Sequence, residues 1–99
     1  MKKVYFDSAA TTQMRKEVID VMTQVMQTEY GNPSSTHAFG RAAKSLIENT
    51  RKSIASILKV NASEIVFTSG GTEADNQIIQ SCVRDLNVKR IISSPVEHH

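Results

Sequence analysis

Apolar side chains recur every three or four residues along two long stretches of the chain, which is the spacing of one helix face. The first stretch covers residues 14 to about 29, and its apolar stripe comprises Met14, Val18, Val21, Met22, Val25 and Met26. The second covers about five turns, and its stripe comprises Phe39, Ala43, Leu46, Ile47, Thr50, Ile54, Ile57 and Leu58. We therefore expect two amphipathic helices, each packing one face against a core.

Turn-forming residues separate these two helices. Gly31 is predicted to take the left-handed conformation that ends the first helix, and Pro33 prevents its continuation. Gly40 would allow close packing near the start of the second helix. His37 lies at the same junction, where a histidine is more often a surface or capping residue than a catalytic one. The second helix is expected to begin at a hydroxyl-bearing cap, one of Ser34, Ser35 or Thr36.

Two shorter stretches are typical of strands. Residues 64–68 are rich in β-branched and aromatic side chains, and residues 88–94 are predicted to form the next strand. Between them Ala74, Ile78 and Cys82 recur at four-residue spacing, which predicts a helix from residue 72 to about residue 85. Strand, helix and strand in this order predict a right-handed parallel unit, and therefore an α/β fold.

The turn between the first of these strands and its helix has the sequence Ser69-Gly70-Gly71-Thr72. A helix N-terminus offers unpaired backbone N–H groups and the positive end of its dipole, which together suit a phosphate. Thr72 can add a hydroxyl donor. Neither G-x-G-x-x-G nor Gly-Lys-Ser/Thr occurs, so the dinucleotide and triphosphate fingerprints are absent. The turn indicates either a site for a single phosphate or a tight connection with an ordinary cap.

Charge and cysteine content exclude several classes of protein. Lys and Arg number 12 and Asp and Glu 10 among the 99 residues, and the basic residues are scattered, so no nucleic-acid face is predicted. Cys82 is the single cysteine, which excludes an intrachain disulfide framework. No stretch approaches the ~20 apolar residues of a membrane span. We expect a soluble protein of the cytoplasm or an equivalent reducing compartment.

The predicted sheet is incomplete. Two parallel strands would have both edges open, and parallel sheets normally have both faces covered. The chain also ends directly after the strand at residues 88–94, where α/β proteins place ligand-binding loops. These features are typical of the first part of a longer protein.

Four sequence blocks resemble, in order, those of cysteine desulfurases of the NifS/IscS type, in the class V aminotransferase group of pyridoxal-phosphate (PLP) enzymes. Together the blocks span the chain, and the combination is specific although no single block is. The blocks are Val4-Tyr5-Phe6-Asp7-Ser8-Ala9-Ala10-Thr11-Thr12; Gly31-Asn32-Pro33-Ser34-Ser35-Thr36-His37; Glu64-Ile65-Val66-Phe67-Thr68-Ser69-Gly70-Gly71-Thr72-Glu73-Ala74-Asp75-Asn76; and Glu97-His98.

This resemblance implies the N-terminal part of a fold-type I PLP-dependent transferase, usually a homodimer. That α/β fold has a mostly parallel sheet with helices on both faces. Residues 1–13, including a short strand or extended arm at residues 4–6, would be an N-terminal arm of the small domain. Residues 14–99 would begin the large PLP-binding domain without completing it.

The resemblance also assigns site residues. Gly71 and Thr72 match the positions whose backbone and hydroxyl bind the cofactor phosphate, although the family more often has Ala in place of Gly71. His98 matches the histidine that stacks on the pyridine ring and assists proton transfer; a terminal Glu-His-His can also be the start of an expression tag. Neither the family's Schiff-base lysine nor its persulfide-forming cysteine has a counterpart here. Cys82 is instead predicted to be a buried structural residue.

The implied activity is removal of sulfur from L-cysteine, which gives L-alanine and an enzyme persulfide. The sulfur would pass to an acceptor or scaffold protein of iron–sulfur cluster or thio-cofactor assembly. Because two catalytic residues are missing, we expect these residues alone to be inactive, and no metal is implied. The alternatives are another class V enzyme, such as a selenocysteine lyase or a small-substrate aminotransferase, and a non-catalytic interaction module.

Overall fold

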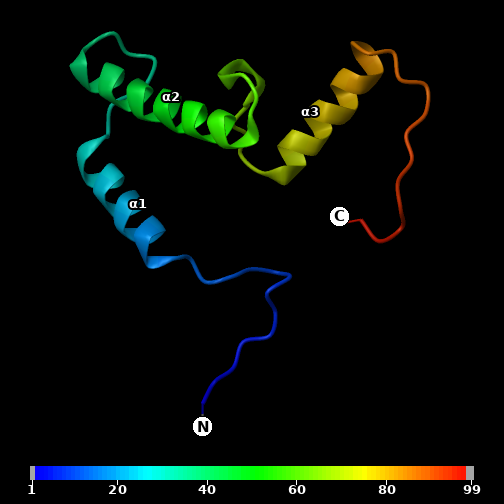
Figure 1. The fold of residues 1–99 in the computed structure, drawn as a ribbon, viewed down its shortest axis with the longest axis horizontal. Helices are drawn as coiled ribbons and strands as arrows, with labels where there is room; N and C mark the ends of the chain where they lie inside the picture. Colours follow the sequence, from blue (N-terminus) through cyan, green and yellow to red (C-terminus); the bar gives the residue numbers. More distant parts are fainter. Residues whose placement is uncertain (1, 98–99) are drawn as a thin grey trace. The chain divides into compact units, whose positions relative to one another are not determined.

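The computed structural model describes residues 2–97, which contain three α-helices joined by loops (Figure 1). The chain divides into two units, one through Ala62 and one from Ser63. The first unit contains α1 and α2, and the second contains α3. The helices are α1 (Lys16–Thr28), α2 (Ala38–Leu58) and α3 (Gly71–Arg84), and a short 3-10 helix, η1, covers Ala62–Glu64.

Helix α1 forms where the first apolar stripe predicts it. Lys16 Nζ lies 2.5 Å from the carboxylate of Asp20 one turn later, an ion pair that contributes little because both side chains are exposed. At the other end the N–H of Glu29 donates to the carbonyl of Val25 at 2.8 Å. These contacts are local in sequence, and the predicted helix is confirmed.

Two glycines let the loop between α1 and α2 close tightly. A Cβ on Gly31 would lie 2.3 Å from the carbonyl oxygen of Phe39, and one on Gly40 would lie 2.3 Å from that of Ser35. No glycine in the described residues has a φ in the left-handed region, so the predicted left-handed Gly31 is wrong. Gly31 is needed because two backbone segments approach each other there. The prediction that Gly40 allows close packing is confirmed.

Helix α2 is capped by His37, not by one of the three hydroxyl residues predicted. The imidazole Nδ1 accepts a long hydrogen bond, 3.4 Å, from the N–H of Gly40, and the backbone of His37 is extended as at other N-caps. The ring also lies edge-on to Phe39, with 6.2 Å between centroids. The expectation that His37 is a surface or capping residue is therefore confirmed.

The hydroxyl residues do not cap α2 because the loop turns before it reaches the helix. Asn32 Oδ1 accepts from the N–H of Ser34 at 2.9 Å, and the Asn32 carbonyl accepts from the N–H of Ser35 at 2.9 Å. This asparagine-centred turn sets the chain direction locally. His37 is consequently the residue that reaches the first free N–H groups of the helix.

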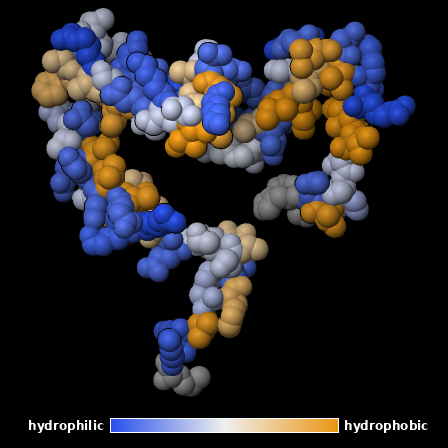
Figure 2. Space-filling view, in the orientation of Figure 1, coloured by the Kyte–Doolittle hydropathy of each residue, from blue (hydrophilic) through white to orange (hydrophobic). Residues whose placement is uncertain are grey.

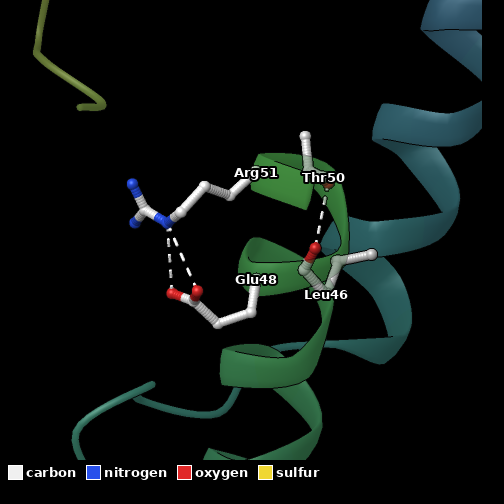
Figure 3. A network of polar contacts seen from close by, with 4 residues as sticks. All are labelled: Leu46, Glu48, Thr50 and Arg51. Carbon is white, nitrogen blue, oxygen red and sulfur yellow. Dashed lines mark hydrogen bonds and ion pairs between the residues drawn. The ribbon is translucent and has the colours of Figure 1, made fainter. Parts of the chain in front are cut away.

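Polar side chains along α2 bond within the helix (Figure 3). Arg51 Nε donates to both carboxylate oxygens of Glu48, at 3.3 and 3.4 Å, and the Thr50 hydroxyl donates to the carbonyl of Leu46 at 2.9 Å. The helix ends at Leu58, and the capping residue Lys59 has a left-handed φ of 57°. The second predicted helix is thus confirmed, and so is the third, which begins at Gly71 and ends at Arg84.

The two predicted strands do not form within residues 2–97. Glu64 ends η1, and residues 65–68 and 88–94 are not paired as strands. Val66 and Ile92 are 61% and 88% exposed. A strand is stabilised by hydrogen bonds to a neighbouring strand, and two parallel segments alone would leave their edges and faces uncovered. The regular structure of the described residues is entirely helical, so the predicted parallel unit and its sheet are not confirmed.

Most large apolar side chains of the helices are exposed, and apolar residues are visible on the molecular surface (Figure 2). Among the described residues the buried apolar side chains are only Ala43 and Ala55, whereas Met26 of α1 is 69% exposed and Ile57 of α2 is 79% exposed. The predicted helices therefore form, but no second layer of the described residues covers their apolar stripes. None of the helices described is long and apolar enough to cross a lipid bilayer.

Candidate functional site

The turn that enters α3 is the candidate site. Gly70 precedes the helix with an extended backbone, and its carbonyl accepts from the N–H of Ala74 at 3.2 Å. The hydroxyl of Thr68 also donates to this carbonyl, at 3.1 Å. Gly71 and Thr72 are therefore the first two residues of α3, as the sequence predicts to within one residue.

The space beside the two glycines of this turn is open. A Cβ added to Gly70 or Gly71 would meet no heavy atom within 4 Å. Neither residue has a φ in the left-handed region. Nothing in the described residues therefore requires glycine at these positions.

The donors present fit a phosphate group. The first N–H groups of an α-helix have no partner within the helix, and here they include those of Gly71 and Thr72. The side-chain hydrogen bonds of this turn are made by Thr68, Ser69, Glu73 and Asn76, and the Thr72 hydroxyl takes part in none of them. The helix dipole adds a partial positive charge at the same place. A hydroxyl, backbone donors and open space are what one phosphate requires.

A carboxylate contact that we did not predict from the sequence holds this turn. Glu73 Oε2 accepts two hydrogen bonds from Ser69, one from its backbone N–H and one from its hydroxyl, both at 2.7 Å. We call this pair the Ser69–Glu73 clasp. It resembles a capping box, in which an acidic residue in the first turn reaches back to the cap N–H, but it is displaced by one residue. The spacing of Ser69 and Glu73 is the sequence feature from which this contact could have been predicted.

The clasp is intact at neutral pH. The hydrogen bonds from the hydroxyl and the backbone of Ser69 lower the pKa of Glu73 below its ordinary value of 4.5. Because the pKa is lowered in the folded state, the stabilisation is present above the unfolded value and is lost as the pH falls through the folded one. The carboxylate is thus charged wherever a phosphate dianion would be present.

The other residues predicted to matter are placed as follows. His98 lies outside the described residues. Cys82 lies on α3 and is half-buried, so it is less enclosed than predicted. Asn76, also on α3, donates from its side chain to the carbonyl of Thr72 at 2.8 Å, which supports the first turn of the helix.

Residues 4–99 match the model of the family described as aminotransferase class-V. The chain belongs to the class V aminotransferase family. Class V aminotransferases are PLP-dependent, and membership implies the fold-type I architecture.

Several known proteins resemble the chain over most of its length. Cysteine desulfurase IscS of Dictyoglomus turgidum is 46% identical over 100 residues, covering 99% of this chain and 25% of the relative. Putative cysteine desulfurase IscS 1 of Bacillus subtilis is 40% identical over 102 residues, covering 100% of this chain and 27% of that relative. Human selenocysteine lyase is 43% identical over 89 residues, covering 90% of this chain and 20% of that relative. The chain spans about a quarter of the length of the curated relatives that it matches.

Proposed function

We propose that the chain is the N-terminal part of a PLP-dependent cysteine desulfurase. The observation that carries this proposal is the similarity to cysteine desulfurases over 99% of the chain or more. The open turn at the start of α3 supports it, because it offers the donors that a cofactor phosphate needs. Family membership alone leaves the substrate open, since the family includes other activities.

Gly71 and Thr72 would bind the phosphate of PLP, through the backbone N–H and the hydroxyl respectively. When bound, PLP supplies an electron sink for bond cleavage next to the substrate amino group. The positive end of α3 would stabilise the phosphate charge. His98 would stack on the pyridine ring and assist proton transfer.

The full-length protein would convert L-cysteine and an enzyme thiol into L-alanine and an enzyme persulfide. The C–S bond of the substrate breaks, a new S–S bond forms on the enzyme cysteine, and a proton is delivered to the carbon that becomes the alanine methyl group. The lysine that holds PLP and the acceptor cysteine would come from other parts of the protein. A sulfur-acceptor or scaffold protein of iron–sulfur cluster assembly would receive the persulfide sulfur.

The full-length protein would also provide the layers that these residues lack. Residues 1–13 would belong to an arm of the small domain, and residues 14–99 would open the large domain. There, residues 64–68 and 88–94 would pair within a mostly parallel sheet, and the exposed stripes of α1 and α2 would be covered. We propose a cytoplasmic homodimer.

A second candidate activity is that of a selenocysteine lyase. The specific observation in its favour is the 43% identity to the human selenocysteine lyase over 90% of the chain. The two activities share the cofactor and differ in whether cysteine itself is consumed. The site residues assigned in this chain would contact the cofactor and therefore do not separate the two activities.

Turnover by the purified full-length protein tests the proposal. With L-cysteine and a reductant we expect sulfide and L-alanine in equal amounts, together with the visible absorbance of protein-bound PLP. Cys82→Ala is the matched control and should keep this turnover, because Cys82 lies half-buried on α3 and is not assigned as the sulfur acceptor. Release of selenide from L-selenocysteine without sulfide from L-cysteine would favour the lyase. Loss of persulfide in Cys82→Ala with the fold intact would contradict the assignment of that residue.

A further inference from the structure

The Ser69–Glu73 clasp joins the residue before the Gly-Gly pair to the residue after Thr72. Both donors of Ser69 are directed to a single carboxylate oxygen, at 2.7 Å each. The clasp therefore fixes both ends of the short segment that contains Gly70, Gly71 and Thr72. Two adjacent glycines have more conformational freedom than any other pair of residues, so this segment has the most to gain from being held.

We propose that Glu73 is a positioning residue for the cofactor phosphate, acting through Ser69. This inference rests on the proposed function, since it concerns the same phosphate site. The clasp occupies both donors of Ser69 and leaves the hydroxyl of Thr72 and the first N–H groups of α3 for the ligand. Holding a turn in its bound conformation raises affinity by reducing the entropy lost on binding.

A Glu73 carboxylate that faced the phosphate would weaken phosphate binding instead of supporting it. The position of the carboxylate distinguishes these two roles. A carboxylate at a helix N-terminus interacts with the same dipole as a phosphate, so an unrestrained Glu73 would compete with the ligand. Here the carboxylate is held by two hydrogen bonds to Ser69, on the side of the turn that precedes the helix. The geometry thus assigns Glu73 to the turn and not to the donors that would face the phosphate.

The test measures the dissociation constants of PLP and of pyridoxal, which lacks the phosphate, for the full-length apoprotein. Glu73→Ala should weaken PLP binding by about three- to tenfold, because hydrogen bonds to a charged acceptor are lost. Pyridoxal binding should be unchanged, so the ratio of the two constants moves. A general loss of folded protein would weaken both ligands equally and leave the ratio where it is.

The conservative variant separates positioning from charge. Glu73→Gln keeps a side-chain oxygen that can accept both hydrogen bonds from Ser69, so it should recover most of the PLP affinity. Asp75→Asn removes a charge from the same helix turn outside the clasp and should leave the ratio of constants unchanged. Ser69→Ala removes the hydroxyl hydrogen bond of the clasp and keeps the backbone one, so it should reproduce part of the effect of Glu73→Ala.

An unchanged ratio in Glu73→Ala, or tighter PLP binding, would overturn the inference. Thr72→Ala then shows which part is wrong. If Thr72→Ala does weaken PLP selectively, the phosphate site stands and only the role of Glu73 is rejected. If it does not, the phosphate site itself is misplaced and the inference is rejected with it.

Discussion

Replacing Gly40 with alanine is expected to destabilise the protein by about 1–3 kcal/mol, the range measured for overpacked sites. The new Cβ would lie 2.3 Å from the carbonyl oxygen of Ser35 and 2.7 Å from that of Asn32. Both atoms belong to the backbone of the turn before α2, so no side-chain rotation relieves the clash. The denaturant midpoint of the full-length protein measures the loss, and an unchanged slope shows that the same transition is being followed.

Gly71→Ala is the matched control for this substitution. Its Cβ would meet no heavy atom within 4 Å, and Gly71 is the first residue of α3. Alanine there restricts the unfolded chain and favours the helix, so we expect unchanged stability or a gain of up to about 1 kcal/mol. Equal losses in Gly40→Ala and Gly71→Ala would contradict the packing described around the loop between α1 and α2.

Thr72→Ala is expected to weaken PLP binding about ten- to a hundredfold, since one hydrogen bond to a charged group contributes about 1.5–3 kcal/mol. The hydroxyl of Thr72 takes part in none of the side-chain hydrogen bonds of this turn, so its removal breaks none of them. The change should therefore appear in cofactor affinity and not in the stability of the apoprotein. Equilibrium titration with PLP measures it.

Thr72→Ser provides the control for this second prediction. It keeps the hydroxyl and removes only a methyl group, so PLP affinity should stay close to that of the parent protein. Equal affinity in the alanine variant and the parent would count against Thr72 as a phosphate ligand. A drop in the serine variant as large as that in the alanine variant would point to packing at Thr72 instead.

The helices could be predicted from the sequence because their signals are local. The apolar stripes at residues 14–29 and 39–58 specify which face is apolar, and the backbone bonds of a helix join residues four apart. Both helices are found within a few residues of the predicted ends. What the stripes could not specify is what covers them, since that depends on residues far away in sequence.

The strands illustrate the opposite case. Residues 64–68 and 88–94 have the side chains of strands, but a strand is defined by the neighbour with which it pairs. Their composition predicts a preference for the extended backbone of a strand, but the described residues provide no neighbouring strand with which they could pair. Gly31 was mispredicted for a related reason, because its role is set by the approach of Phe39 from the next helix.

The position of the candidate site was predictable, whereas the contacts that hold it were not. The Gly-Gly turn before an amphipathic helix predicts, from local sequence alone, either a site for a single phosphate or a tight connection with an ordinary cap. The clasp depends on the side-chain conformation of Glu73, which reaches back past the cap residue to Ser69. His37 was expected to be a surface or capping residue, but the hydroxyl residues were the predicted caps of α2 because they are the stronger statistical caps.

A crystal structure of the full-length protein with PLP would show whether the start of α3 holds the cofactor phosphate. We expect a phosphate oxygen within hydrogen-bond distance of Thr72 Oγ1 and of the Gly71 N–H. We also expect residues 64–68 and 88–94 to be paired in a parallel sheet beside that turn. A PLP phosphate held by other residues, with the start of α3 facing away from it, would contradict this expectation.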